Sequence, residues 1–533
     1  KPHEDNWRDV TPRGFSSWSI QNKPSDADDL VVIASQDRNP AFADLYTTDQ
    51  QGGNQTLLIK NQGQTLGWVL AKDLSPMLRF DRIKGNNTQL LVNRDSGWQP
   101  LIDIAPSDTF YVLEVSPSAE FALAISARGR NTAALVRLDL TDGSEQVLHE
   151  QADEDLAEII NFDLYDGKID MVIPQVGDVT PVGFTKAGKK LATLIAKQGQ
   201  HVSIDRLRWA GNGDFVTATL SVDAQSYSNH IFDLNLGTDT KISDFYFKTK
   251  HTDALVPTET VQITARDGMK LNALLLKPKG VDGAAPMVLE VHGGPAGQVK
   301  WEYHHFRQFL VNRGYAVLAV NFRGSSGLSK IYQAAGYGEY GRKMQDDLVD
   351  ATLWAIDQGI ADPKAIAING SSYGGYASAM GLVRDPDLFK AGIIEHAMLD
   401  VAYQSQYPPH SWGLYLGQWE RYFGDINTPG DMEKMHQRSP INLVDQMQAA
   451  ALMVAGKRDP VVGFEQTERF ITKAKDLGKN IDSLIFENEG HGIDKWQSKI
   501  RHARRVEDFL AEHLGGRSGN WDWIEPIAAY LDK

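Results

Sequence analysis

The sequence lacks cysteine altogether, in a chain of 533 residues. Disulfide bonds, thiolate metal ligands and cysteine nucleophiles are therefore excluded. No apolar run approaches the roughly 20 residues that a membrane-spanning helix needs, so we predict no membrane span. Basic residues are in the minority, with 54 Lys and Arg against 69 Asp and Glu and a net charge of −15. That charge disfavours a nucleic-acid partner.

The remaining composition is that of an ordinary soluble globular protein, with 42% hydrophobic and 23% charged residues. The chain is too long for one hydrophobic core, so we expect two large domains or one domain with a repeat array. A protein without thiols suits both the cytoplasm and the periplasm. The sequence also leaves open whether the chain forms a homo-oligomer. The chain begins at Lys1 and not at methionine, which leaves a removed leader or missing N-terminal residues open.

The first 255 residues consist of short apolar-alternating runs separated by polar turns. A strand–turn–strand pattern begins near residues 45, 90, 135, 182 and 232, and its copy at 182–196 is one of the weaker ones. The spacing of about 45–50 residues is close to the length of a four-stranded propeller blade. We therefore predict an all-β propeller domain over residues 1–255, with a β-sandwich or two stacked β-domains as the alternative.

From about residue 256 the rhythm changes, and apolar strands alternate with helical stretches. We place the boundary near 250–257 and predict a second domain over 256–533. Strands are expected at 258–265, 270–278, 287–293, 315–322, 365–370, 391–397, 451–456 and 482–488, and helices at 344–358, 463–476 and 495–514. Such alternation predicts an α/β domain, a mostly parallel sheet with helices on both faces.

The stretch "AIAINGSSYGGYASAM" (365–380) holds two adjacent serines after an apolar strand. A nucleophilic serine on a sharp strand-to-helix turn needs small residues two positions before and after it, as in G-x-S-x-G. Gly370 and Gly374 flank Ser372 at this spacing, whereas side chains flank Ser371. We therefore predict Ser372 as a nucleophile, and a tight turn without chemistry is the alternative.

A second serine pair, in "NFRGSSGLS" (321–329), lacks this spacing because Arg323 stands two positions before Ser325. We expect a loop that shapes the site there.

A serine nucleophile needs a general base, which in turn needs an orienting carboxylate. His491 stands in the glycine-flanked loop "ENEGHGI" directly after a strand, which suits a base, whereas His396 lies in an apolar strand pattern and is expected to be structural. Asp459 follows the preceding strand in "KRDPVV" and is the predicted acid; a plain turn residue is the alternative. Glu487 and Glu489 compete for that role but lie too close in sequence to His491.

Acyl transfer also needs an oxyanion hole, commonly made of two backbone N–H groups. The residue after the nucleophile, Tyr373, supplies one, and the loop "HGGP" (292–295) is the expected source of the other, with Gly294 as our choice. No second ligand lies at metal-site spacing from His292, so we expect a structural role for it and neither a metal nor a cofactor in the protein.

These motifs together resemble the prolyl oligopeptidase family of serine peptidases, most closely its acylaminoacyl-peptidase and dipeptidyl-peptidase branches. They are "HGGP" at 292, "NFRGSSG" at 321, "DDLVDATLWAIDQGIADPKAIAINGSSYGGY" at 346–376, "GKRDPVV" at 456 and "EGHG" at 489. The resemblance implies an α/β-hydrolase domain whose triad is Ser372, Asp459 and His491. It also implies a pocket lined by Tyr373 and Val462, and a propeller that caps the site and admits only short peptides.

Two departures from the family accompany the resemblance. Family propellers usually have seven blades, whereas about 255 residues at this spacing make five or six. Either the chain begins partway through the propeller or the array is smaller. The paired glutamates of dipeptidyl peptidases are not evident either, because "ADEDLAEI" (152–159) does not match them. The choice between exopeptidase and endopeptidase therefore stays open.

The expected function is hydrolysis of short peptides. The aromatic segment 411–424, with Trp412 and Tyr415, is expected either to border the substrate pocket or to pack between the domains. Two other functions stay open: an esterase or lipase on the same fold, and a propeller-based binding protein whose hydrolase half is inactive.

Overall fold

The structure is a computed structural model. It describes residues 18–20, 30–39, 42–49, 53, 55–71, 73–84, 87–116, 118–152, 154–160, 169–174, 181–199, 202–210, 214–222, 227–244, 253–409, 412, 416–519 and 523–531.

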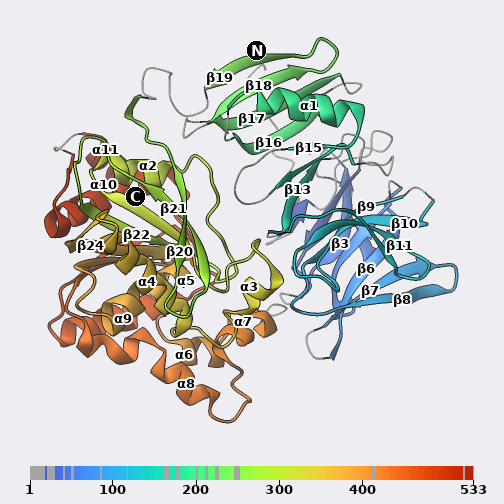
Figure 1. Cartoon of the computed structure of the whole chain (residues 1–533). Helices are drawn as coiled ribbons and strands as arrows, with labels where there is room; N and C mark the ends of the chain where they lie inside the picture. Colours follow the sequence, from blue (N-terminus) through green and yellow to red (C-terminus); the bar gives the residue numbers. More distant parts are fainter. Residues whose placement is uncertain are drawn as a thin grey trace.

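The described residues before 245 form five antiparallel sheets that follow one another along the chain (Figure 1). Four sheets have four strands each and the fourth in chain order has three. The strands are β1 (Trp18–Ile20), β2 (Leu30–Ser35), β3 (Asp44–Asp49), β4 (Thr56–Ile59); β5 (Thr65–Leu70), β6 (Pro76–Arg82), β7 (Thr88–Arg94), β8 (Gly97–Ile104); β9 (Phe110–Val115), β10 (Phe121–Ser126), β11 (Ala134–Asp139), β12 (Glu145–His149); β13 (Leu156–Ile160), β14 (Met171–Pro174), β15 (Val182–Gly183); and β16 (Val202–Ala210), β17 (Phe215–Val222), β18 (Ser228–Asp233), β19 (Thr238–Asp244). These sheets are the blades of the β-propeller.

The predicted hairpin over 182–196 is wrong, because only its first two residues form a strand. β15 is followed by helix α1 (Lys186–Ala196), which begins after Thr185. The Thr185 hydroxyl accepts a hydrogen bond from the N–H of Gly188 at 3.1 Å, which satisfies an N–H group at the helix start. The buried side chains of Leu191 and Ile195 lie on one face of this helix, as an amphipathic helix requires.

The second part of the chain forms one eight-stranded sheet in the order β20-β21-β23-β22-β24-β25-β26-β27. The first two pairings in this order are antiparallel and the others are parallel. The strands are β20 (Glu259–Thr264), β21 (Lys270–Leu276), β22 (Ala285–Val291), β23 (Ala316–Asn321), β24 (Ala361–Ser371), β25 (Ala391–Glu395), β26 (Ala450–Gly456) and β27 (Ile481–Phe486). All eight lie where the sequence predicts a strand, which confirms the α/β-hydrolase fold. The division at residue 255 stays a prediction.

Helices cover both faces of this sheet (Figure 1). They are α2 (His305–Asn312), α3 (Lys330–Ala334), α4 (Lys343–Asp357), α5 (Tyr373–Arg384), α6 (Val401–Gln406), α7 (Leu416–Phe423), α8 (Asp431–Gln437), α9 (Phe464–Asp476), α10 (Trp496–Leu514) and α11 (Ile524–Leu531), with a 3₁₀ helix, η5 (Pro440–Gln446). Successive strand residues face opposite sides, so Leu289 packs with α4, α5 and α9 whereas Val288 packs with α2 and α10.

Hydrogen bonds join the two parts of the chain. The N–H of Asp155 donates to the carbonyl of Gly327 at 3.0 Å, and the N–H of Lys330 donates to the carbonyl of Asn131 at 2.8 Å. The Arg421 guanidinium, on α7, donates to the carbonyl of Pro106 at 2.5 Å. The loop 321–329 and helix α3 therefore contact the propeller directly.

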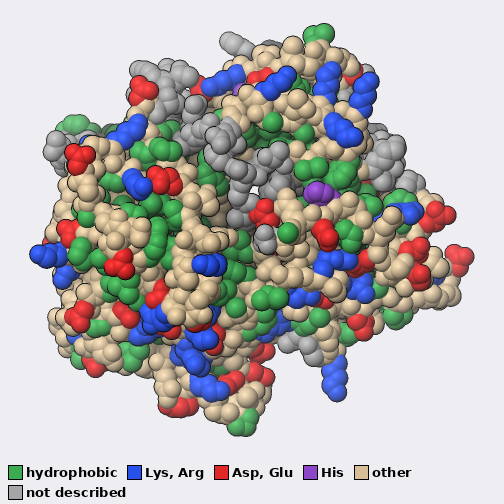
Figure 2. All heavy atoms as spheres, in the orientation of Figure 1, with side chains coloured by type: hydrophobic (Ala, Val, Ile, Leu, Met, Phe, Trp, Pro, Cys, Tyr) green, Lys and Arg blue, Asp and Glu red, His purple; other side chains and the backbone are tan. Residues whose placement is uncertain are grey.

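No helix in the described ranges has the length and apolar character that crossing a bilayer requires. Acidic and basic side chains are interspersed over the face seen in Figure 2.

Candidate active site

Ser372 lies at the turn between β24 and α5. Its backbone has φ 60° and ψ −119°, a conformation that residues with a side chain rarely adopt. The N–H of Ser372 donates to the carbonyl of Glu395 at 2.9 Å, and the carbonyl of Ser372 accepts from the N–H of Tyr376 at 3.0 Å. These bonds hold the strained turn, and strain of this kind concentrates at functional sites.

The two glycines that flank Ser372 are required by close backbone contacts. A Cβ on Gly370 would lie 2.5 Å from the carbonyl carbon of Gly374, and a Cβ on Gly374 would lie 2.0 Å from the carbonyl oxygen of Val291. Both distances are far inside van der Waals contact. The glycine spacing in the sequence therefore reflects how closely this turn packs against β22.

Asp459 and His491 meet on the loops that follow β26 and β27. His491 Nδ1 lies 2.7 Å from Asp459 Oδ2, a hydrogen bond. Asp459 Oδ1 accepts the N–H groups of Val461 and Val462 at 2.8 and 2.9 Å. The Asp459 side chain is 3% exposed and that of His491 is 22% exposed. A buried carboxylate thus orients a more accessible imidazole.

Ser372 lies one strand away from this pair. β24 pairs with β25, and the residue that follows β25, His396, contacts both Asp459 and His491. Within the part of the chain that the structure describes, Ser372 Oγ makes no hydrogen bond with His491. In enzymes without substrate such a bond is often long and tightens only in the complex.

The predicted oxyanion-hole donors belong to two segments that lie next to the serine. Tyr373 is the first residue of α5, so its N–H has no acceptor within the helix. The loop that contains Gly294 is close as well, because a Cβ on Gly293 would lie 3.5 Å from the Ser372 Cβ. Gly294 itself has φ 131°, which favours glycine.

The second serine pair and His292 have structural partners. Ser325 Oγ lies 2.8 Å from His292 Nε2 and donates to the carbonyl of Phe322 at 2.7 Å, and the His292 ring stacks on the Phe322 ring. Burial lowers the pKa of His292 to about 4, so this imidazole is neutral at physiological pH. These contacts hold the loop after β22 against the loop after β23.

The predicted pocket residues belong to the apolar core on the α5 side of the sheet. Tyr373, Trp412 and Val462 are all buried there. The Tyr373 hydroxyl and the Trp412 indole N–H are both buried without a hydrogen-bond partner. Trp412 stacks on Trp419 with ring centroids 5.3 Å apart, so it packs within the hydrolase part. Tyr415 lies outside the described residues.

Three further ionisable groups beside the site were not predicted as site residues. His396, whose side chain is 1% exposed, has its Nδ1 atom 3.7 Å from Asp459 Oδ2. Glu395, the last residue of β25, lies 3.1 Å through Oε1 from His502 Nε2 on α10. Burial lowers the pKa of His396, although Glu395 and Asp459 act in the opposite direction. The sequence signal for Glu395 and His396 is their position at the carboxyl end of β25, whereas His502 lies within helix α10 and has no such signal.

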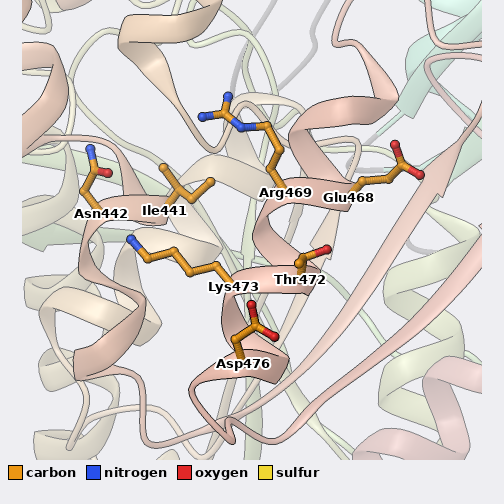
Figure 3. A pocket seen from close by; sticks show the side chains of 7 residues that line it. All are labelled: Ile441, Asn442, Glu468, Arg469, Thr472, Lys473 and Asp476. Atoms are coloured by element: carbon orange, nitrogen blue, oxygen red, sulfur yellow. The ribbon is translucent and has the colours of Figure 1, made fainter.

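A cavity of about 610 Å³ lies between η5 and α9 (Figure 3). Its lining side chains are Ile441, Asn442, Glu468, Arg469, Thr472, Lys473 and Asp476. None of them is a predicted site residue. Across the described ranges, no group of three or more His, Asp and Glu side chains is placed to hold a metal ion.

Known proteins resemble this chain in sequence and in fold. A sequence profile of the prolyl oligopeptidase family matches residues 301–517. Dipeptidyl aminopeptidase BIII of Pseudoxanthomonas mexicana is 30% identical over 538 positions, which cover 96% of this chain and 75% of that protein. Dipeptidyl peptidase family member 6 of Caenorhabditis elegans is 24% identical, with 92% of this chain and 70% of that protein covered. The crystal structure of a puromycin hydrolase has a TM-score of 0.78 at 18% identity, covering 97% of this chain and 82% of that one.

A β-propeller followed by an α/β-hydrolase sheet, with these relatives, defines a serine-type peptidase. The chain belongs to the prolyl oligopeptidase family. The similarity to puromycin hydrolase concerns the fold, which the two proteins share over nearly the whole length of this chain.

Proposed function

We propose that the chain hydrolyses short peptides through Ser372, His491 and Asp459. Ser372 Oγ attacks the scissile carbonyl carbon while its proton passes to His491 Nε2. The proton then passes to the leaving amine as the C–N bond breaks, which leaves an acyl-enzyme on Ser372. Water, deprotonated by His491, hydrolyses that ester and frees the serine. Asp459 stabilises the imidazolium in both halves of the reaction.

The observation that carries this proposal is the hydrogen bond of 2.7 Å between His491 Nδ1 and Asp459 Oδ2. It fixes the imidazole so that its other nitrogen, Nε2, serves as the base. The strained turn at Ser372, at the neighbouring strand ends, supports the same assignment. A carboxylate–imidazole pair next to a serine on such a turn is the arrangement that activates a hydroxyl.

We assign the oxyanion hole to the N–H groups of Tyr373 and Gly294. The unpaired N–H at the start of α5 and the closeness of the 292–295 loop to Ser372 support this assignment. Removing one such donor typically costs about 2.7–4 kcal/mol of transition-state stabilisation. We also propose that Val462, Trp412 and Tyr415 shape the pocket for the side chain next to the scissile bond. The burial of Val462 and Trp412 beside Tyr373 supports this for the first two.

We propose further that the propeller restricts access, so that short peptides are favoured. Direct hydrogen bonds between the propeller and the loop and helix after β23 support this role. The sequence relatives named as dipeptidyl peptidases fit substrates of this size.

A fluorophosphonate probe tests the nucleophile. Wild type should be labelled, Ser372→Ala should not, and Ser325→Ala should retain labelling because its hydroxyl has structural partners. His491→Ala should abolish peptide turnover, whereas His436→Ala, which removes an exposed imidazole, should not. Equal labelling of wild type and Ser372→Ala would refute the enzyme assignment and favour a binding protein.

A substrate panel tests the peptidase assignment against an esterase. It contains dipeptidyl, acylaminoacyl and aminoacyl p-nitroanilides together with p-nitrophenyl esters. Higher kcat/KM on amides of short peptides than on simple esters is the expected result. Turnover confined to the esters would replace the peptidase with an esterase on the same fold.

A further inference from the structure

His396 has a strained backbone held by two neighbouring strands. Its φ is +45°, and among the non-glycine residues described after 252 only Ser372 shares a positive φ. The N–H of His396 donates to the carbonyl of Val454 at 2.9 Å, while the preceding carbonyl, of Glu395, accepts from Ser372. Backbone strain of this kind is unfavourable and persists where the surroundings enforce it. The turn therefore fixes the position of the His396 side chain.

That position is against the Asp459–His491 pair. His396 Nδ1 lies 3.7 Å from Asp459 Oδ2, the same oxygen that His491 Nδ1 contacts at 2.7 Å. The His396 and His491 rings meet edge to face, with centroids 5.8 Å apart. His396 therefore contacts the acid and the base of the proposed triad at once.

The ring of His396 is buried yet has no hydrogen-bond partner. Its residue is 2% exposed, and neither Nδ1 nor Nε2 is paired in the structure. An unpaired polar group in the interior carries a desolvation cost that an apolar ring of the same shape would avoid. The Asp459 carboxylate is the acidic group within 4 Å of Nδ1, with Oδ2 at 3.7 Å.

The charged groups around His396 come from four elements: Glu395 on β25, Asp459 after β26, His491 after β27 and His502 on α10. Burial outweighs the two carboxylates and holds the imidazole of His396 neutral. A neutral imidazole carries one N–H, on either nitrogen. With the proton on Nδ1, Asp459 Oδ2 is an acceptor 3.7 Å away.

We propose that His396 is a positioning residue for the triad, whose Nδ1–H donates a second hydrogen bond to Asp459 Oδ2 as His491 accepts the serine proton. The proposal rests on the proposed function of Ser372, Asp459 and His491. Asp459 Oδ1 is held by two backbone N–H groups, and His396 holds Oδ2 from the buried side. The Asp459 carboxylate then keeps its orientation while His491 becomes an imidazolium and the hydrogen bond between them becomes charge-assisted. Misplacing a catalytic group by about 1 Å can reduce the rate about 100-fold.

Two substitutions separate this role from simple packing. His396→Phe keeps an aromatic ring but has no donor, and we expect kcat to fall about 10- to 100-fold with KM nearly unchanged. His396→Asn places an amide N–H near the Nδ1 position and tolerates positive φ, so it should recover kcat to within about fivefold of wild type. Melting temperatures of both variants control for folding.

Wild-type kcat in His396→Phe would overturn the proposal, and so would equal losses in the Phe and Asn variants. Should His396→Phe fail to fold, the ¹⁵N chemical shifts of the wild-type imidazoles decide instead. Protonation of His396 on Nδ1 supports the proposal, and protonation on Nε2 overturns it. Ser372→Ala, assayed in parallel, distinguishes failure of the role of His396 from failure of the proposed function. If it is inactive while His396→Phe is fully active, only the role of His396 fails; if it remains active, the proposed function itself fails.

Discussion

At the scale of single residues, the two oxygens of the Asp459 carboxylate have separate partners. Oδ1 accepts backbone N–H groups and Oδ2 accepts from His491. In Asp459→Asn the amide oxygen can still accept the backbone N–H groups, but the amide nitrogen cannot accept from Nδ1–H. We expect kcat to fall about 10³- to 10⁴-fold, measured on a peptide p-nitroanilide, with little change in melting temperature. Asp476→Asn, at an exposed carboxylate, is the control, and a similar kcat in both variants would contradict the role of Asp459.

The Gly374 position shows why the turn needs glycine. In Gly374→Ala the new methyl group would lie 2.0 Å from the Val291 carbonyl oxygen, so the backbone must shift. Overpacking typically costs about 1–3 kcal/mol, and here it also displaces Ser372. We expect a lower melting temperature and loss of fluorophosphonate labelling. Gly492→Ala, where a Cβ meets nothing within 4 Å, should retain both; its failure would point to the loop around His491 instead.

At the scale of elements, β25 and α10 are joined by a partly buried ion pair between Glu395 and His502. Burial lowers the pKa of His502, but the charge of Glu395 and its hydrogen bond outweigh burial and hold that pKa above its ordinary value. Burial raises the pKa of Glu395, but the charge of His502 and its hydrogen bond outweigh burial and hold that pKa below its ordinary value. The His502 contribution to stability is therefore full below about pH 6.5 and is lost as the pH rises through the raised pKa. The Glu395 contribution is full above about pH 4.5 and is lost as the pH falls through the lowered pKa.

The variant His502→Gln isolates this contribution. We expect it to be less stable than wild type by about 1–3 kcal/mol near pH 6, because it leaves the partly buried Glu395 carboxylate without its charged partner. The stability difference between wild type and variant should shrink as the pH rises to about 8, since wild type loses the His502 charge. Urea unfolding at several pH values measures it, with His436→Gln as an exposed control. A difference that does not vary with pH would contradict the pairing.

The elements themselves follow closely from the sequence. All eight strands of the large sheet were predicted because apolar runs bounded by turn residues are local signals. Helix α1 was missed, although Thr185 is a capping residue and Leu191, Leu194 and Ile195 have helical spacing. This segment also lies at the repeat spacing of the hairpins around it, and that spacing competes with the local helical period.

The candidate site can be predicted in part, because its residues follow strands that the local sequence signals indicate. Ser372, Asp459 and His491 stand at strand ends, and the topology of a parallel sheet brings such ends together. The apolar strand pattern around His396 predicts a structural role, because it reveals neither the positive φ nor the contact with Asp459. The hydrogen bond from the Val462 N–H to Asp459 could not be predicted either, because loop geometry has no periodic signal in the sequence.

At the scale of the whole molecule, the proposed restriction of access places the entry of substrate at the junction of propeller and hydrolase. Besides the bond from Asp155 to the Gly327 carbonyl, cross-links come from α3 and α7, where Lys330 contacts Asp108 and Arg421 donates to the Pro106 carbonyl. The Asn131 side chain also accepts from the N–H of Ile331 at 3.0 Å. Interfaces between domains of one chain resemble transient protein interfaces, so relative motion is expected wherever such contacts are few.

Loosening this junction should therefore widen the range of peptides that the enzyme cleaves. In the double variant Lys330→Ala/Arg421→Ala, kcat/KM for a dipeptide p-nitroanilide should stay within about threefold of wild type, because the triad is untouched. The kcat/KM for a long, unstructured peptide should rise relative to that value by about 3- to 10-fold, since opening of the propeller limits its entry. Lys434→Ala, which removes an exposed contact to Asp431 within the hydrolase part, is the control. An unchanged ratio of long to short substrate would show that these contacts do not govern access, and would place the length limit in the pocket around Tyr373.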